Sequence, residues 1–179
     1  MSTTPADVVS FWRDAGMDKW FRGGEVFDDA CRAHFLDAHF VAAQRGFEDW
    51  METAEGALAL LILLDQIPRN IFRNSAHAFA TDALALHYAT RAIEAGFDAA
   101  TDAGLRMFFY LPFEHSEAIA DQQRAVAFFS ALGNANLLGY ANEHREVIAR
   151  FGRFPHRNAA LGRSNTGEEQ AWLDAGGGF

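Results

Sequence analysis

The sequence is poor in residues that could cross-link it. Cys31 is its single cysteine, so no disulfide can form within the chain, as is usual for a reducing compartment. The histidines are scattered and no His-Glu-x-x-His motif occurs, so the sequence shows no pattern of metal ligands. Glycine-rich nucleotide-binding motifs are missing as well. We therefore expect no metal and no cofactor.

Positive charge and long apolar runs are also scarce. Lysine occurs once, at Lys19, and the formal net charge is -9, so the surface as a whole should repel nucleic acids and anionic membranes. The longest purely apolar run, from Ala57 to Leu64, has eight residues and is too short to span a bilayer. The opening stretch MSTTPADVVSFWRDAG lacks the basic and apolar regions of a signal peptide. These absences predict a cytoplasmic protein that binds neither nucleic acid nor membrane.

Sequence patterns typical of β-structure are absent too. No segment alternates apolar and polar residues over the length of a strand, and no Asn-Gly or Asp-Gly hairpin turn occurs. Apolar residues instead recur at helical spacing in residues 4–16, 25–45, 79–96 and 117–151. Glycine interrupts the last stretch near Gly133, and a capping box of Thr166 with Glu169 begins a final helix. We predict an all-α fold of antiparallel helix pairs.

The length of the chain suits one domain, which we place at residues 1–175. The glycines that follow should form a flexible tail at residues 176–179. Within residues 4–16, Thr4 should cap a helix that ends at Gly16.

Two histidines fall on apolar helical stripes. His34 shares its stripe with Phe27 and Cys31, and His144 shares one with Ala141 and Ile148. Both side chains should therefore face inward. A histidine on an apolar face is more often a hydrogen-bonded core residue than a catalyst, so a structural and a functional role both stay open for His144.

Three prolines lie in segments that combine apolar and ionisable residues. The segments are LLDQIPRNIFR around Pro68, FFYLPFEHSE around Pro112 and RFGRFPHRN around Pro155. Proline usually ends or kinks a helix, so these are places where polar side chains can meet in a cavity.

Together with the C-terminal LGRSNTGEEQAWL, these segments resemble the signature of a bacterial family, domain of unknown function 924. The resemblance extends from the VVSFW helix to the C-terminal capping box. Members of that family are similar in fold to tetratricopeptide-like helical proteins. The resemblance thus implies a tetratricopeptide-like α-α superhelix and brings no established activity with it.

Arginine is concentrated near the C-terminus, with five arginines and one acidic residue between positions 144 and 163. The planar guanidinium suits bidentate contacts to carboxylate or phosphate, which predicts a site for a small anionic ligand. The candidate ligand-binding residues are Asp65, Arg69, Asn70, Arg153, Arg157 and Asn158. Alternatively, the arginines pair internally with carboxylates such as Asp65 and Glu114 and hold helix ends together. The spacing of Asp65 and Arg69 suits such a pair on one helix face.

Candidates for proton transfer lie in the same segments. They are Glu114, His115, His144 and His156. Ser116 follows His115 directly, so the two side chains point apart on a helix and do not form a nucleophile and base; Ser116 should instead cap the next helix. Whether the protein is an enzyme stays open. The alternative to a ligand-binding protein is an interaction module that binds a partner peptide, with the charged cluster as a structural network.

Overall fold

All regular secondary structure is helical in residues 3–179, the part of the chain described by this computed structural model. Contacts within the chain define an N-terminal unit, Met1–Arg73 with His77–Pro112, and a C-terminal unit, Asn74–Ala76 with Phe113–Phe179. The all-α prediction is therefore confirmed for the described residues.

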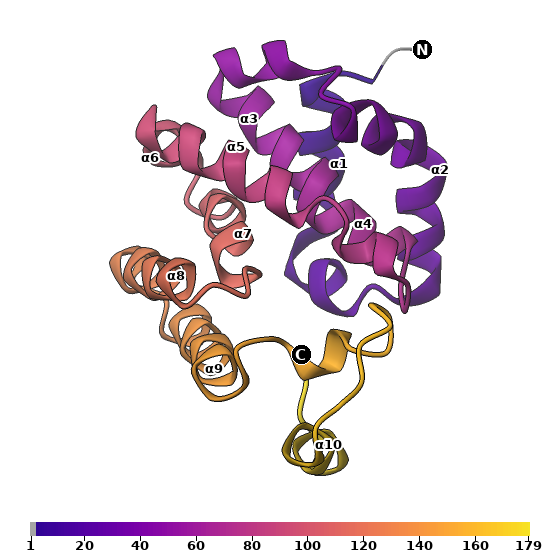
Figure 1. Ribbon diagram of the computed structural model, residues 1–179. Coiled ribbons are helices and arrows are strands. Elements are labelled where there is room, and N and C mark those ends of the chain that lie inside the picture. The colour runs from indigo at the N-terminus through magenta and orange to yellow at the C-terminus, as the bar shows by residue number, and fades with distance from the viewer. Residues whose placement is uncertain (1–2) are drawn as a thin grey trace. The chain divides into compact units, whose positions relative to one another are not determined.

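The N-terminal unit contains most of the helices (Figure 1). They are α1 (Pro5–Arg22), α2 (Gly24–Ala43), α3 (Ala54–Leu61), α4 (Ile67–Ile71), α5 (Asp82–Glu94) and α6 (Phe97–Ala100). Helix α3 packs against both α1 and α5, and α2 packs against α4. The apolar run Ala57 to Leu64 is completely or almost completely buried, which explains why it has no polar face.

Helix α1 begins at the predicted cap and is interrupted at the predicted glycine. Thr4 accepts a hydrogen bond from the backbone of Asp7, whose carboxylate accepts one from the Thr4 backbone, and Pro5 takes the first helical position. The predicted end of the first helical run at Gly16 is confirmed, because Gly16 leaves the helical conformation with a φ of 69°. A second helical run continues beyond this kink to Arg22 within the bounds of α1.

In helix α2, His39 faces the core, whereas His34 was predicted to do so. His34 is exposed, whereas Phe35 and His39 are buried, so the inward orientation expected for His34 is wrong. Adjacent helical positions differ by about 100° in direction, and the buried face is centred on Phe35 rather than on its neighbour. Cys31 is fully buried on this face, and burial followed by the charge of Asp28 raises the pKa of its thiol to about 12.

Between α3 and α4, one turn of π-helix spans Ile62–Gln66. Asp65 and Gln66 lie in this turn and are buried, and Pro68 follows within α4. A π turn inserts one residue into the helix and often accompanies a functional or strained position. Here it allows the helix to continue past a proline that lacks a backbone donor.

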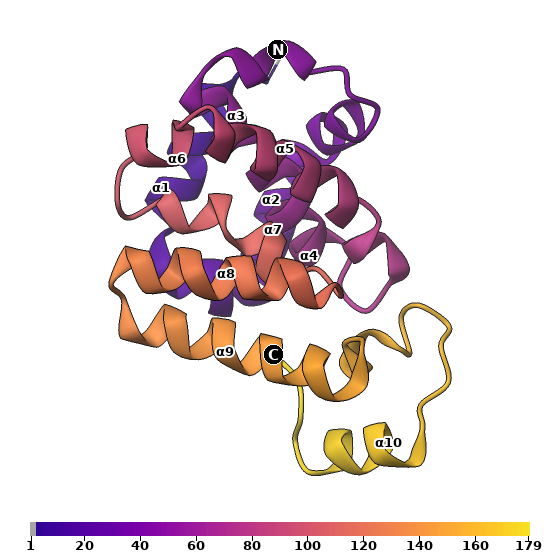
Figure 2. The ribbon, with the colours of Figure 1, turned by 60° about the vertical axis from the view of Figure 1, so that its left-hand side comes forward.

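The C-terminal unit is built on a helical hairpin, with α7 (Leu111–Glu114) leading into it from the N-terminal unit. Helices α8 (Ile119–Leu132) and α9 (Ala135–Phe151) lie side by side and antiparallel, as Figure 2 shows. Gly133, with a φ of 75°, ends α8, and the Asn134 side chain caps α9. The interruption predicted near Gly133 is therefore confirmed.

Helix α10 (Gly167–Asp174) follows a short 3-10 turn, Pro155–Arg157. The capping box of Thr166 and Glu169 at its start is confirmed, with hydrogen bonds in both directions. Phe154 is fully buried among Val147, Ile148, Phe151 and Trp172. This small apolar core joins α9 to α10.

Candidate functional site

The C-terminal unit gathers several of the predicted acid-base residues around His144 of α9. The His144 side chain is buried, and its Nδ1 donates a hydrogen bond to the Tyr140 carbonyl at 2.8 Å. Glu114 is also buried, and its Oε1 lies 3.6 Å from the same nitrogen. The ring of His115 lies 6.4 Å from that of His144, between centroids. Residues from α7 and α9 thus meet here.

Its surroundings hold His144 in the neutral form. The pKa of this imidazole is lowered to about 3, mainly by burial and to a smaller extent by nearby His115, Arg157 and His156. The hydrogen bond to Tyr140 acts in the opposite direction. A carbonyl only accepts hydrogen bonds, so Nδ1 carries the proton and Nε2 carries the lone pair. His144 can therefore accept a proton or a hydrogen bond through Nε2.

Aromatic rings surround this cluster. The Phe179 ring stacks on His144 at 3.6 Å between centroids, and Phe154 meets the same imidazole edge-on at 5.6 Å. The His156 ring lies 5.6 Å from that of Phe179. The Arg157 guanidinium stacks over the Phe154 ring at 4.4 Å. One neighbourhood, formed by the end of α7, α9 and the 3-10 turn, therefore contains the predicted candidates Glu114, His115, His144, His156 and Arg157.

Arg153 is held by a carboxylate of its own unit. Its Nε and Nη2 donate to the two carboxylate oxygens of Glu169 at 2.6 and 2.8 Å, and Nη2 also donates to the Ser164 carbonyl. The hydrogen bonds from Arg153 are the main reason that the pKa of Glu169 is lowered to about 2. The Arg153 guanidinium is thus part of the contact between the segment after α9 and the first turn of α10.

A second arginine, Arg163, also pairs with a carboxylate of the C-terminal unit. Both terminal nitrogens of Arg163 donate to Glu117, at 2.8 and 2.9 Å, and Glu117 also accepts a hydrogen bond from the Phe154 backbone. Burial raises the pKa of Glu117, but its contacts with Arg163 and Phe154 outweigh this and lower it. Arg163 and Glu117 thus connect residues far apart in sequence. Internal pairing was one of the two alternatives left open for these arginines, with Asp65 and Glu114 as the example partners rather than Glu117 and Glu169.

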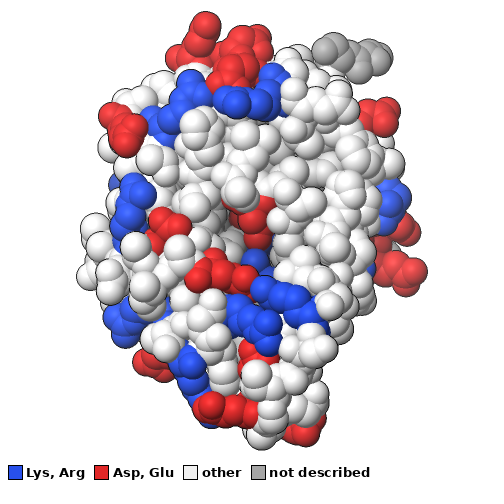
Figure 3. All heavy atoms as spheres, viewed as in Figure 1, with Lys and Arg blue, Asp and Glu red and all other residues white. Residues whose placement is uncertain are grey.

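Asn158 completes the predicted set in this unit. Its side chain is buried, and its amide donates to Asn165 at 2.8 Å. Its carbonyl Oδ1 accepts no hydrogen bond from the described residues. On the face drawn in Figure 3, basic side chains lie beside acidic ones rather than in one large basic patch. On this face, the charged groups are thus arranged for local pairing.

The other predicted ligand residues, Asp65, Arg69 and Asn70, belong to the N-terminal unit. The predicted pair of Asp65 and Arg69 is confirmed, with 3.2 Å between Arg69 Nη1 and Asp65 Oδ1. Arg69 also forms a bidentate pair with Asp82, at 2.9 Å for both contacts. Asn70 donates to the Gln66 carbonyl. That all three proline segments share one site stays a prediction.

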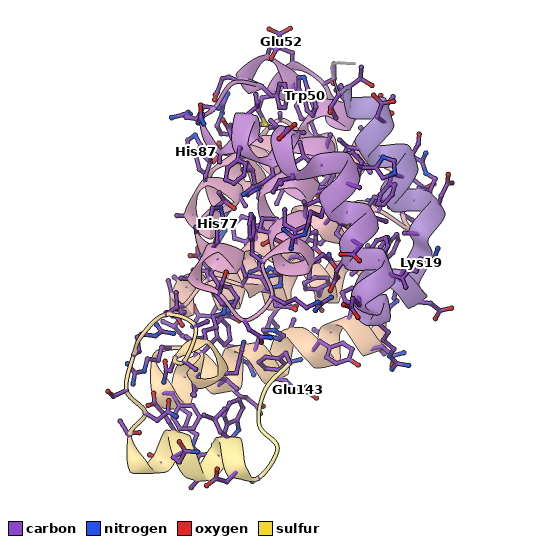
Figure 4. All side chains as sticks on the ribbon, turned by 90° about the vertical axis from the view of Figure 1, so that its right-hand side faces the viewer. Lys19, Trp50, Glu52, His77, His87 and Glu143 are labelled. Atoms are coloured by element: carbon purple, nitrogen blue, oxygen red, sulfur yellow. The ribbon has the colours of Figure 1, made fainter. Side chains whose placement is uncertain are left out.

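Two features of the structure were not predicted from the sequence. In the N-terminal unit, His39 and His77 face each other with 3.4 Å between their Nε2 atoms, and His39 Nδ1 donates to the Leu63 carbonyl. Figure 4 labels His77. The recurrence of apolar residues in α2 contained the signal for His39, because this residue lies one helical turn after Phe35.

The second feature is a cavity of about 300 Å³ in the C-terminal unit. Helix α9, helix α10 and the last three residues line it, with Glu143 on α9 labelled in Figure 4. The lining residues are Glu143, Glu146, Val147, Arg150, Phe151, Trp172, Gly177, Gly178 and Phe179. The spacing of Glu143, Glu146 and Arg150 is that of residues on one face of a helix. The sequence does not show what covers that face.

Within the described residues, no three or more His, Cys, Asp or Glu side chains gather as a metal site would require. None of the described helices combines the length and the apolar character needed to cross a membrane.

Comparisons with known proteins agree with the predicted resemblance. A family model described as "Bacterial protein of unknown function (DUF924)" matches residues 8–177. Among solved structures, the chain is similar to "Structure of Protein of Unknown Function ATU0120 from Agrobacterium tumefaciens", with 51% sequence identity and a TM-score of 0.93. That match covers 96% of this chain and 97% of the other. A search of curated proteins gave no match.

Proposed function

The chain belongs to the DUF924 family of bacterial proteins of unknown function, and we propose that its C-terminal unit binds a small anionic ligand. The proposed site is the group formed by His115, His144, His156 and Arg157. The observation that carries the proposal is geometric: the His115 ring lies 6.4 Å from that of His144, and the Phe154 ring, which meets His144 edge-on, also contacts His156 and Arg157. A local positive potential in a chain with a net charge of -9 favours a small anion there.

Glu114 and His144 supply acid-base chemistry to this site. Glu114 Oε1 lies 3.6 Å from His144 Nδ1, and the imidazole is neutral with a lone pair on Nε2. An acidic ligand can transfer a proton to Nε2, and the imidazolium formed would then attract the ligand anion.

Arg69 and Arg153 have a structural role in this proposal. Each donates two hydrogen bonds to one carboxylate, Asp82 for Arg69 and Glu169 for Arg153. An anion would have to displace a carboxylate that is already bound in bidentate geometry. Arg157, which stacks on Phe154, is the arginine that we place in the site.

Thermal shift measurements with phosphate, sulfate and a panel of small carboxylates test this proposal. A ligand at ten times its Kd stabilises the folded state by about 1.4 kcal/mol, or roughly 3 to 6 °C in Tm for a chain of this size. At least one of these anions should raise the Tm more than chloride at equal ionic strength. Arg157→Lys should reduce that response, whereas the matched control Arg145→Lys should keep it. If no anion raises the Tm of the wild type, or if Arg157→Lys responds fully, the proposal is wrong.

A second candidate function is a tetratricopeptide-like interaction module. It is supported by the exposed apolar side chains Met17 and Phe21, which are 52% and 53% exposed one helical turn apart, and by Val26, which is 85% exposed. If this face binds a peptide, a peptide selected on the wild-type protein should lose binding to the variant Met17→Ser/Phe21→Ser. Unchanged binding would exclude this face as the binding surface.

A further inference from the structure

The cavity between α9, α10 and the C-terminal residues has a chemical character of its own. Its α9 wall presents Glu143, Glu146 and the aromatic ring of Phe151, and its α10 wall presents the ring of Trp172. The cavity volume of about 300 Å³ is at the lower end of the range for small-molecule sites. Carboxylates and aromatic faces together define what can bind here.

The charge of the cavity is negative. Arg150 is the basic residue in the lining, and its guanidinium is paired with Glu168 at 2.8 Å while stacking over the Phe151 ring at 4.7 Å. The side chains of Glu143 and Glu146 form no ion pair or hydrogen bond with any described residue. Because Glu168 offsets the charge of Arg150, two exposed carboxylates remain to attract a cation.

Aromatic rings are the second feature of the cavity that favours an organic cation. The ring centroids of Phe151 and Trp172 lie 5.6 Å apart at an angle of 57°, so the two faces are not stacked on each other. Trp172 is half-buried, and Phe179 contributes a third ring to the lining. Organic cations bind to aromatic faces, most strongly to tryptophan, through the negative potential of the ring.

The C-terminal residues approach the indole closely because Gly177 has no side chain. A Cβ atom at Gly177 would lie 2.3 Å from the Trp172 ring, and the Gly177 backbone donates to the Trp172 carbonyl at 3.0 Å. The backbone therefore packs directly against the indole.

From this combination we propose that the cavity binds a small organic cation of the quaternary ammonium class. A tetra-substituted ammonium group has no N–H to donate, so it is recognised by aromatic faces and by carboxylate charge rather than by specific hydrogen bonds. This site is separate from the anion site proposed above in both its charge and its polar residues. The aromatic residue Phe179 contacts both, since it lines the cavity and stacks on His144.

Titration with choline chloride, followed by calorimetry and by tryptophan fluorescence, tests the proposal. The comparison ligand is 3,3-dimethyl-1-butanol, which has the shape of choline without its charge. Choline should bind and the neutral alcohol should bind at least about tenfold more weakly, with sodium chloride added to equalise ionic strength. Absence of choline binding, or equal binding of the two compounds, would overturn the proposal.

Variants then locate the site. Glu143→Gln/Glu146→Gln should weaken choline binding by about 3- to 30-fold, as should Trp172→Leu. Glu52→Gln, an exposed glutamate of the N-terminal unit, is the control and should bind as the wild type does. The glutamate positions are exposed, so these variants should fold even if Trp172→Leu does not. Wild-type affinity in the double glutamine variant would refute this location.

The same variants separate this proposal from the anion site. Arg157→Lys should leave choline binding unchanged, and Glu143→Gln/Glu146→Gln should leave the Tm response to anions unchanged or slightly increased. Loss of both responses in the glutamine variant would contradict two independent sites.

Discussion

His144 shows how burial determines the charge of one side chain. Its pKa is lowered to about 3, compared with 6.5 for an accessible histidine, so the unfolded chain binds a proton that the folded chain does not. The contribution of neutral His144 to the free energy of unfolding is therefore fully present above about pH 6.5 and is lost as the pH falls toward 3. The maximum slope is about 1.4 kcal/mol per pH unit.

This pH dependence is measurable by urea denaturation of the wild type and His144→Gln between pH 7 and pH 4. The free energy of unfolding of the wild type should fall more steeply with decreasing pH than that of the variant, because the variant lacks the titrating imidazole. Parallel curves would show that His144 is not kept neutral by the fold.

The stabilising contact of Arg153 depends on its planar guanidinium, which donates to both carboxylate oxygens of Glu169. Lysine would keep the positive charge but lose the two parallel hydrogen bonds to Glu169. We expect Arg153→Lys to lower the Tm in the absence of any ligand. Arg145, which forms no ion pair with the described residues, is the control, and Arg145→Lys should keep the wild-type Tm. Equal Tm values for the two variants would show that the pair with Glu169 adds no stability.

Among the elements, α9 and α10 depend on the small core around Phe154. Phe154 is fully buried, and its ring packs with Val147 and Ile148. Phe154→Ala should lower the free energy of unfolding by about 3 to 5 kcal/mol, because truncation removes apolar contacts and leaves a cavity. Leu161, which is 37% exposed in the same unit, is the control, and Leu161→Ala should change stability by less than about 0.5 kcal/mol. A small effect of Phe154→Ala in urea denaturation would mean that this core collapses around the missing ring.

Sequence patterns predicted elements well where the signal was local. The helix cap at Thr4, the capping box at Thr166 and the interruption at Gly133 depend on residues within a few positions of one another. The phase of α2 was mispredicted because His34 and Phe35 are neighbours, and spacing alone did not decide which of them the rest of the unit would cover. The π turn at Ile62–Gln66 has no distinctive sequence signal besides the proline that follows it.

At the scale of the whole chain, contacts between distant segments were the hardest to predict. Helical spacing indicated that His144 faces inward, but it contained no information on whether Glu114 or His156 would lie nearby. Because helical spacing contains no information on distant segments, it also did not predict the partners of Arg153 and Arg163. These partners are glutamates that lie in, or just before, the first turn of a helix. A single domain at residues 1–175 and a flexible tail at residues 176–179 stay predictions, while contacts divide the chain into two units.

The absence of a metal-ligand pattern leads to a prediction for the whole protein. Dialysis against a chelator should leave the Tm unchanged, because no metal would be contributing to the free energy of folding. The measurement is a thermal melt before and after dialysis, with added zinc as the reverse test. A drop of several degrees that zinc restores would reveal a structural metal ion.

Cys31 makes the opening of the N-terminal unit accessible to a kinetic measurement. The thiol is the only one in the chain, is fully buried and has a pKa near 12, so a thiol-specific reagent has no other target and no route to this one in the closed state. The rate at which 5,5'-dithiobis(2-nitrobenzoic acid) labels the native protein, divided by the rate for the unfolded chain, is then the fraction of time that α2 is detached from its neighbours. Labelling of Cys31 thus follows the stability of the N-terminal unit within the intact protein.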